Sequence, residues 1–106
     1  IVNRVEPSAA ARMACIEIHG LACAICGMTF EEVYGDEFSD LIHVHHLDPI
    51  AGSTGVADVN PRHDLRPICP NCHAATHYRG QNRPLAYVRE CLTRQATRST
   101  STRRRD

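Results

Sequence analysis

Several residue types are missing or scarce in this sequence. Each absence limits the size of the core or argues against a class of protein. There is no tryptophan, and the 106 residues include only two phenylalanines, so we expect one small domain with a thin core. No apolar run is long enough to span a membrane and no signal-peptide pattern is present, which argues against a membrane protein or a secreted one. Lysine is absent, so every basic side chain is an arginine.

The charges balance overall, but they are distributed unevenly along the chain. Residues 1–60 hold two arginines and nine acidic residues, whereas residues 61–106 hold ten arginines and three acidic residues. The planar guanidinium group suits phosphate oxygens, so a basic second half is compatible with binding to a nucleic-acid backbone. For the arginine-rich tail at 96–106, a solvated and disordered segment is an equally simple interpretation.

Cysteine and histidine are abundant, with six and seven copies in this short chain. Four cysteines form two pairs with two residues between the partners, Cys23 with Cys26 and Cys69 with Cys72. At this spacing a tight turn brings two thiolates to one tetrahedral ion, so we expect a structural Zn²⁺ held by all four. Disulfides or buried thiols are the alternative, but the pairing favours metal in a reducing, intracellular setting. We expect a cytoplasmic, bacterial protein. Cys15 has no such partner and is expected to be a buried apolar residue.

The second cysteine pair opens a stretch that carries another ligand spacing. His73 and His77 are four residues apart. If Pro70 begins a helix, which its fixed φ and missing N–H permit, the two imidazoles project from one face of that helix and can chelate an ion. One short helix would then be anchored by the thiolate-bound ion and present part of a second metal site.

The remaining pattern predicts short elements on either side of this stretch. We expect a helix at 7–19, capped by Glu6 or Ser8 and ended by Gly20, and then an acidic loop with a short turn at 30–40. A strand follows at 41–47 and ends at Asp48 and Pro49. After it we expect an extended loop at 51–63, a second strand at 65–68 and a last helix from Pro84 onward. On the first strand, alternation places His43 and His45 on one face and His46 on the other, unless the strand ends or bulges at His46.

Taken together, these residues resemble a known family. The runs IHVHHLDPI (42–50) and NPRHDLRPICPNCHAATH (60–77), framed by the two cysteine pairs, are similar to the HNH endonucleases, the ββα-metal nucleases. The resemblance covers roughly residues 12–80 and looks closest to the four-cysteine branch that includes McrA-type methyl-dependent restriction endonucleases. It implies an α+β fold, in which a small ββα-metal domain spanning 1–95 is held together by the four-cysteine zinc site and flanked by a helix at each end.

The resemblance also implies a role for each histidine of the pattern. His46 matches the general base that deprotonates the attacking water, and His45 matches the metal ligand that precedes it in the family. His73 matches the last histidine of the motif, and His77 follows at the spacing that colicin-type nucleases use for a further ligand. The implied catalytic metal site is therefore His45, His73 and His77, while His43 is expected only to line the strand.

The middle position of the motif departs from the family pattern. Asp64 stands where the family has asparagine, nine residues before His73. Asp64 can brace the loop that holds His46 by accepting backbone hydrogen bonds, or it can bind the metal. Asn60 is a rival for the same role, and we rank it second.

The implied activity is metal-dependent hydrolysis of DNA phosphodiester bonds. An unperturbed imidazole has a pKa of about 6.5, so a neutral histidine can accept a proton from water. The catalytic divalent cation is left open among Mg²⁺, Mn²⁺, Ni²⁺ and Zn²⁺. Arg66 and Arg79 are candidates for phosphate contacts, with surface solvation as an equally simple interpretation for each.

Other classes of function remain open. A non-catalytic zinc ribbon that binds DNA would need the cysteines but not the histidines, and a protein-binding scaffold would need no second cation. No element that reads bases is evident, and little aromatic surface is available for base flipping. Because the chain begins at Ile1 rather than methionine, we expect a fragment, with sequence recognition in an upstream domain or in a homodimer.

Overall fold

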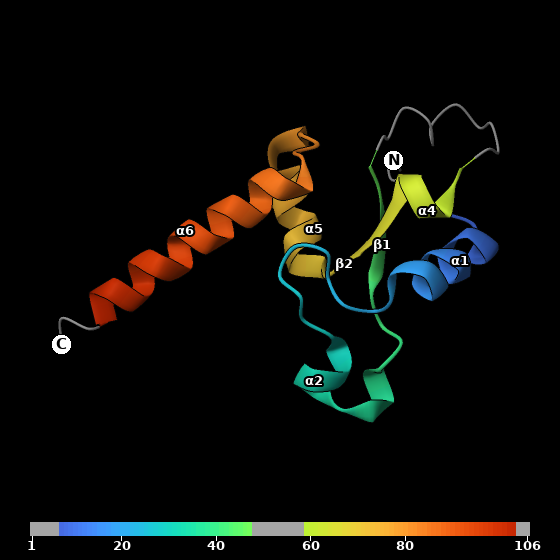
Figure 1. Ribbon diagram of the computed structural model, residues 1–106, viewed down its shortest axis with the longest axis horizontal. Coiled ribbons are helices and arrows are strands. Elements are labelled where there is room, and N and C mark those ends of the chain that lie inside the picture. Colours follow the sequence, from blue (N-terminus) through green and yellow to red (C-terminus); the bar gives the residue numbers. More distant parts are fainter. Residues whose placement is uncertain (1–6, 48–58, 104–106) are drawn as a thin grey trace.

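The computed structural model describes residues 7–47 and 59–103, and side chains as far as Arg98. The elements, in chain order, are α1 (Ala9–His19), α2 (Phe30–Tyr34), η1 (Asp36–Phe38), β1 (His43–His46), α4 (Pro61–Asp64), β2 (Leu65–Ile68), α5 (Pro70–His77), η2 (Tyr78–Gly80) and α6 (Leu85–Arg103) (Figure 1). This arrangement confirms the predicted small α+β fold. The Glu6 cap, the turn at Asp48 and Pro49 and most of the loop expected at 51–63 lie outside the described residues.

A two-stranded antiparallel sheet forms the centre of the domain. β1 pairs with β2 so that His43 lies opposite Ile68 and His46 lies opposite Leu65. The second strand has the predicted limits, and the first is the central part of the predicted segment 41–47. Because α5 begins two residues after β2 ends, the sheet and this helix together make a ββα unit.

The start of α5 has the geometry that its proline predicts. Pro70 occupies the first turn, and Cys69 caps the helix by accepting the N–H of Cys72 on its sulfur. The other end is held by Arg83, whose guanidinium donates to the carbonyls of Ala75, Thr76 and Tyr78 at its C-terminal end. Helix α5 is therefore fixed at both ends, which limits how far its side chains can shift.

Helix α1 closes one side of the sheet. Ser8 caps it by accepting the N–H of Ala11 at 3.1 Å, and Gly20 ends it with a φ of 86°, a conformation that costs glycine little. From within the helix, Arg12 donates to the carbonyl of Ile42 at 2.7 Å. That hydrogen bond ties α1 to the residue immediately before β1.

Among the described residues, the apolar core consists of two clusters, one on the cysteine side of the sheet and one beneath α1. The larger cluster contains the buried residues Cys23, Ile25, Phe30, Ile42, Ile68, Cys69, Cys72 and Val88. The smaller cluster contains Cys15, Val44 and Leu65, which confirms Cys15 as a buried apolar residue. Since three of the eight residues of the larger cluster are cysteines of the two pairs, the core and the candidate zinc site are one structure.

Apart from residues 61–63, which were expected to lie in an extended loop but begin α4 directly after its N-cap residue Asn60, two segments differ from the expectation drawn from the sequence. Residues 30–40 were expected to form a loop, but they contain α2 and η1. Thr29 caps α2, and the ring of Phe30 is buried and stacks on Tyr34 at 5.6 Å. These contacts give a short acidic segment enough support to be helical.

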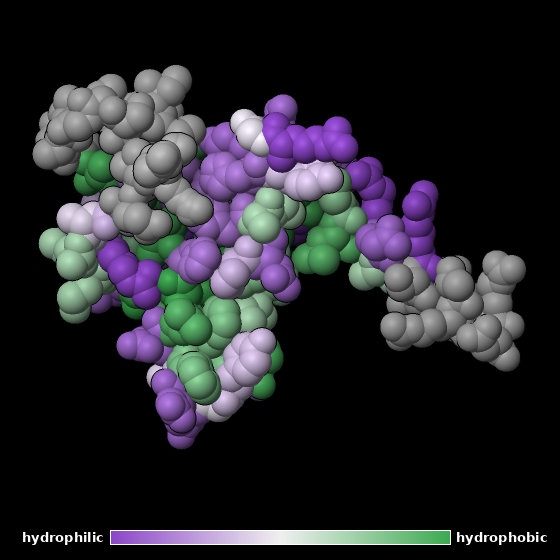
Figure 2. Space-filling model, turned by 180° about the vertical axis from the view of Figure 1, so that it is seen from behind, coloured by the Kyte–Doolittle hydropathy of each residue, from purple (hydrophilic) through white to green (hydrophobic). Residues whose placement is uncertain are grey.

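The second difference is the length of α6. This helix continues to Arg103, through most of the segment 96–106 that was expected to be disordered. It extends away from the rest of the domain (Figure 1), and its coloured outer turns are mostly hydrophilic (Figure 2). Val88 is buried in the larger core cluster and Leu85 packs against it, so the helix is anchored at its first turns. Among the described residues, none of the helices combines the length and hydropathy that a membrane span requires.

Candidate functional site

The structure brings the four paired cysteines together. Their sulfur atoms all lie within 4.8 Å of one another, and the sulfurs of Cys26 and Cys69 are 3.8 Å apart. All six cysteines are free in the structure, which contains none of the disulfides considered as the alternative. Zn–S bonds of about 2.3 Å in a tetrahedron place sulfur atoms about 3.8 Å apart, and the observed separation fits that geometry.

The backbone around these sulfurs also suits a metal-thiolate cluster. The N–H groups of Ile25 and Cys26 point at the sulfur of Cys23, each at 3.4 Å. Burial opposes ionisation of Cys23, but backbone N–H groups outweigh burial and lower the pKa of this thiol to about 7. Burial and the neighbouring cysteines raise the pKa of Cys72. Several thiolates this close repel one another, and a dication relieves that repulsion.

A second group of possible ligands comes from β1 and α5. His45 from β1 and the pair His73 and His77 from α5 place one ring nitrogen each within 4.8 Å of the others. The three ring centroids are 5.0 to 5.3 Å apart. His45 is buried, His73 is half-buried and His77 is exposed, so the group opens toward solvent. Three imidazoles with an open side are a typical donor set for a catalytic divalent cation.

The protonation of this group is compatible with metal binding. Burial, followed by the charges of His73, His77 and His46, lowers the pKa of His45 to about 4. His45 is therefore neutral at neutral pH, which is the form that binds a cation. Nδ1 of His77 lies 3.1 Å from the carbonyl oxygen of Gln81. A carbonyl can only accept, so this Nδ1 carries the proton and Nε2 is left to act as the ligand.

His46 is the last residue of β1 and is half-buried. It follows His45 directly and is close enough to affect the pKa of that residue, but it is not one of the three grouped histidines. The backbone after it is tied to α4, because the N–H of Leu47 donates to the carbonyl of Asp64 at 2.9 Å. His46 is therefore next to a candidate ligand without being one itself, so its imidazole is available to accept a proton near the site.

The side chains of both candidates for the middle motif position accept backbone N–H groups at the start of α4. Asn60 is the N-cap residue, and its side-chain oxygen accepts the N–H of Arg62 at 3.0 Å. Asp64 reaches back with Oδ2 to accept the N–H of Asn60 at 2.8 Å. The structure therefore shows the carboxylate bracing this short helix and does not place it among the three grouped histidines.

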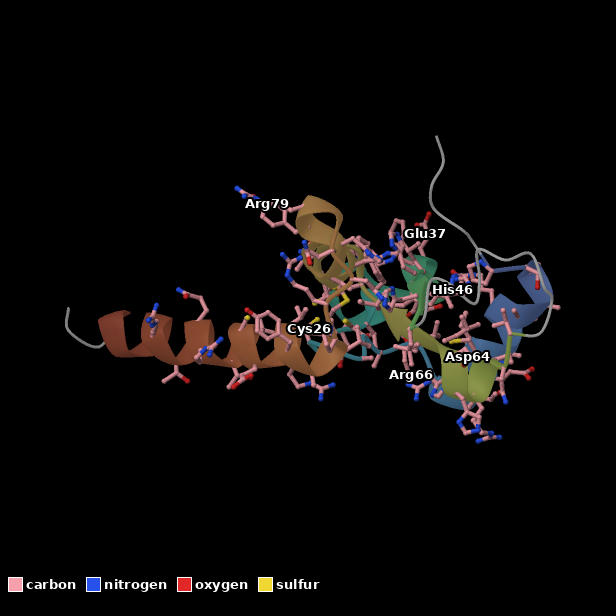
Figure 3. The ribbon with its side chains drawn as sticks, turned by 90° about the horizontal axis from the view of Figure 1, so that it is seen from above. Cys26, Glu37, His46, Asp64, Arg66 and Arg79 are labelled. Atoms are coloured by element: carbon pink, nitrogen blue, oxygen red, sulfur yellow. The ribbon has the colours of Figure 1, made fainter. Side chains whose placement is uncertain are left out.

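The two arginines that were candidates for phosphate contacts lie in different surroundings. Arg66 is paired with His45 across the strands, and its Nη1 donates to the carbonyls of Arg62 and Leu65 at 2.9 and 2.7 Å. Arg79 is exposed and sits over the ring of Tyr78 at 5.4 Å. Figure 3 shows it pointing outward, apart from His46 and Arg66.

Sequence reasoning missed one residue of this region. His43 was expected only to line the strand, but its Nδ1 lies 2.9 Å from Nδ1 of His73. Strand alternation does predict that His43 and His45 share a face, and both rings do lie against His73. No sequence pattern specified the hydrogen bond itself, because it joins residues 30 positions apart.

Fold and geometry together define a small α+β domain with two candidate metal centres, one of thiolates and one of imidazoles. The sequence model of the HNH endonuclease family matches residues 23–79, a span that contains all seven candidate ligands. Since this match covers more than half of the chain, the protein belongs to the HNH endonuclease family. Comparisons with curated proteins and with solved structures find no match.

Proposed function

We propose that this protein is a metal-dependent endonuclease that hydrolyses phosphodiester bonds of DNA. The observation that carries the proposal is the convergence of His45, His73 and His77, with His46 beside them, in a chain of the HNH endonuclease family. Neither a zinc ribbon nor a scaffold needs three imidazoles within 4.8 Å of one another on an open face.

In this proposal His46 is the general base. A neutral imidazole can take a proton from the attacking water, and a positioned base of this kind contributes about 10²- to 10⁴-fold to the rate. Its place at the end of β1, next to His45, supports the assignment. Asp64 acts indirectly, since its carbonyl holds Leu47 and thereby the backbone that follows His46. Asn60 acts with it by capping the same short helix.

His45, His73 and His77 would hold the catalytic divalent cation. When bound, such a cation stabilises negative charge on the scissile phosphate and on the leaving 3′ oxygen as a Lewis acid. Mg²⁺, Mn²⁺, Ni²⁺ and Zn²⁺ all remain candidates, although imidazole ligands suit the transition metals better than Mg²⁺. We propose Arg66 and Arg79 as contacts to the DNA backbone, where the fork of the guanidinium matches phosphate oxygens.

The four cysteines would hold a structural Zn²⁺. Their placement supports assigning the protein to the four-cysteine branch of the family, which includes McrA-type restriction endonucleases. We further propose that base recognition comes from a second copy of the chain or from an additional domain, because the sequence offers little aromatic surface for reading an extruded base.

The decisive experiment is plasmid nicking by the purified protein with each of the four cations, beside His46→Ala. We expect the substitution to lower the cleavage rate by at least about 10²-fold, because only the proton acceptor is lost. Binding of the uncleaved plasmid and the circular dichroism spectrum should stay as in the parent. A variant that still cuts at the parent rate would refute the assignment of His46.

Metal content separates the proposal from its competitors. A fully loaded sample should hold two ions per chain, one in each ligand group. A single ion per chain, together with no cleavage under any cation, would favour a non-catalytic zinc module instead.

A further inference from the structure

The contact between His43 and His73 is not explained by the roles proposed so far. The two Nδ1 atoms are 2.9 Å apart, and the rings meet edge to face with centroids 5.2 Å apart. His43 is exposed and comes from β1, whereas His73 comes from the first turn of α5. His43 does not belong to the group of three convergent histidines, although it touches one member of that group directly.

The short distance between these two nitrogens limits which of them can carry a proton. A separation of 2.9 Å between ring nitrogens is a hydrogen bond, so one Nδ1 must carry a proton and the other must accept it. Because Nδ1 of His73 is used in this bond, its Nε2 is the nitrogen left to bind a cation. A neutral His73 that binds through Nε2 carries its proton on Nδ1, and His43 must then be the acceptor.

The neighbouring ligand on α5 shows the same arrangement with a different acceptor. Nδ1 of His77 donates to the carbonyl oxygen of Gln81 at 3.1 Å, which leaves Nε2 as its ligand atom. Both α5 histidines therefore have their Nδ1 bound to a fixed partner outside the group of three. Partners of this kind set the tautomer and the ring orientation of metal-binding histidines.

We infer that His43 is a positioning residue, which accepts the Nδ1 proton of His73 and thereby fixes the ring whose Nε2 binds the catalytic cation. This inference rests on the proposed imidazole metal site and adds a residue to it. His43 then carries its own proton on Nε2. Loss of the acceptor should leave the three ligands in place but let the ring of His73 turn.

The test measures cation affinity directly, in addition to cleavage. The parent, His43→Ala and His43→Asn, each prepared with one zinc ion per chain in the four-cysteine site, are titrated with Co²⁺, which reports its ligand set through its visible absorption bands. We expect His43→Ala to bind Co²⁺ about 10- to 100-fold more weakly, the usual effect of removing a partner of a ligand. The shape of the bands should not change. In His43→Asn the amide oxygen lies at the position of Nδ1, and the affinity should return to within a few-fold of the parent.

Cleavage provides a second readout. The kcat of His43→Ala should fall with its cation affinity at limiting Co²⁺, while KM for the plasmid stays as in the parent. His63→Ala removes another exposed histidine, from α4, and should match the parent in both assays. Thermal unfolding of all variants verifies that each one is folded.

Every other result overturns the inference. Unchanged Co²⁺ affinity in His43→Ala shows that the hydrogen bond positions nothing, and altered absorption bands show that His43 is itself a ligand. An Asn variant as weak as the Ala variant shows that the acceptor is not the cause. A parent that binds no Co²⁺ beyond its zinc refutes the metal centre of the proposed function itself, which is a different failure.

Discussion

Asp64 contributes to the structure through two separate groups. Its side-chain Oδ2 accepts the N–H of Asn60 at 2.8 Å, and its backbone carbonyl accepts the N–H of Leu47 at 2.9 Å. Only the first of these bonds depends on the side chain. The connection between α4 and the end of β1 should therefore survive a substitution at this position.

We predict that Asp64→Asn is tolerated or improves activity. The amide oxygen can still accept the N–H of Asn60, so the free energy of unfolding should change by less than about 1 kcal/mol, whereas Asp64→Ala should cost about that much. Urea unfolding and plasmid nicking measure the two effects. A folded Asn variant that does not cleave DNA would mean that the carboxylate has a direct part in the chemistry.

At the scale of elements, α5 serves both candidate centres. Its N-terminal turn carries Cys72 and, one residue later, His73, and its last residue is His77. Thr76 faces inward between them, fully buried, and donates to the carbonyl of Cys72 at 2.9 Å. The spacing of ligands along this helix therefore sets the distance between the two centres.

Helix α6 packs against the domain through its first turns, and a substitution of Val88 tests this packing. Val88 is 8% exposed, whereas Leu92, one turn later, is 44% exposed. We predict that Val88→Ala lowers the free energy of unfolding by about 2 kcal/mol, because two buried methyl groups are lost. Leu92→Ala should change it by less than about 0.5 kcal/mol. Equal effects in urea unfolding would show that the helix packs differently from the structure.

How far the sequence predicts these elements depends on what stabilises each one. β2, α5 and α1 were predictable because Pro70, Ser8 and Gly20 mark their ends through local backbone chemistry. Helix α2 was not predicted, although Thr29 and Glu32 have the spacing of a helix-capping pair, because the helix has only five residues and burial of Phe30 in the larger core cluster also supports it. The full length of α6 was not predictable from the sequence, since its outer part has no apolar stripe that would indicate a helix.

The candidate site, too, was predictable from the sequence only in part. Grouping of Cys23, Cys26, Cys69 and Cys72 and of His45, His73 and His77 followed from ligand spacing and the family pattern, and the structure brings each set together. The hydrogen bond of His43 to His73 could not be foreseen, because it depends on how β1 meets α5. Spacing along the chain thus predicts ligands better than it predicts the partners of ligands.

At the scale of the whole molecule, the thiolate cluster is part of the core rather than an attachment to it. Cys23, Cys69 and Cys72 are buried among Ile42 and Ile68 in the larger cluster. The turn between Cys23 and Cys26 is also tied to β2, because the N–H of Ala24 donates to the carbonyl of Pro67 at 2.8 Å. In a domain this small, the ion and the apolar contacts would stabilise the same residues.

Two buried cysteines provide a matched pair of tests. Cys69→Ala removes a candidate zinc ligand, and we expect the variant to lack a cooperative unfolding transition, because metal binding of this kind supplies on the order of 10 kcal/mol to folding. Cys15 is fully buried but belongs to the other cluster, so Cys15→Ala should cost about 1 kcal/mol and keep the zinc content of the parent. Thermal unfolding and metal analysis make the comparison.

Chelator should act on the molecule in two stages. The imidazole group has an open side and neutral ligands, whereas the thiolate cluster offers four charged ones, so the catalytic cation should leave first. As EDTA is raised, plasmid nicking should stop before the far-ultraviolet circular dichroism spectrum changes. Simultaneous loss of both signals would contradict the assignment of two separate centres.

The two cysteine pairs lie far apart along the chain, with 42 residues between Cys26 and Cys69. A shared ion would therefore cross-link the two pairs and close the intervening residues into a loop. Cutting the backbone near Gly35 would not release the two parts, since the ion would still join Cys23 and Cys26 to Cys69 and Cys72. A nicked molecule of this kind would migrate as two fragments in detergent and as one particle in native buffer.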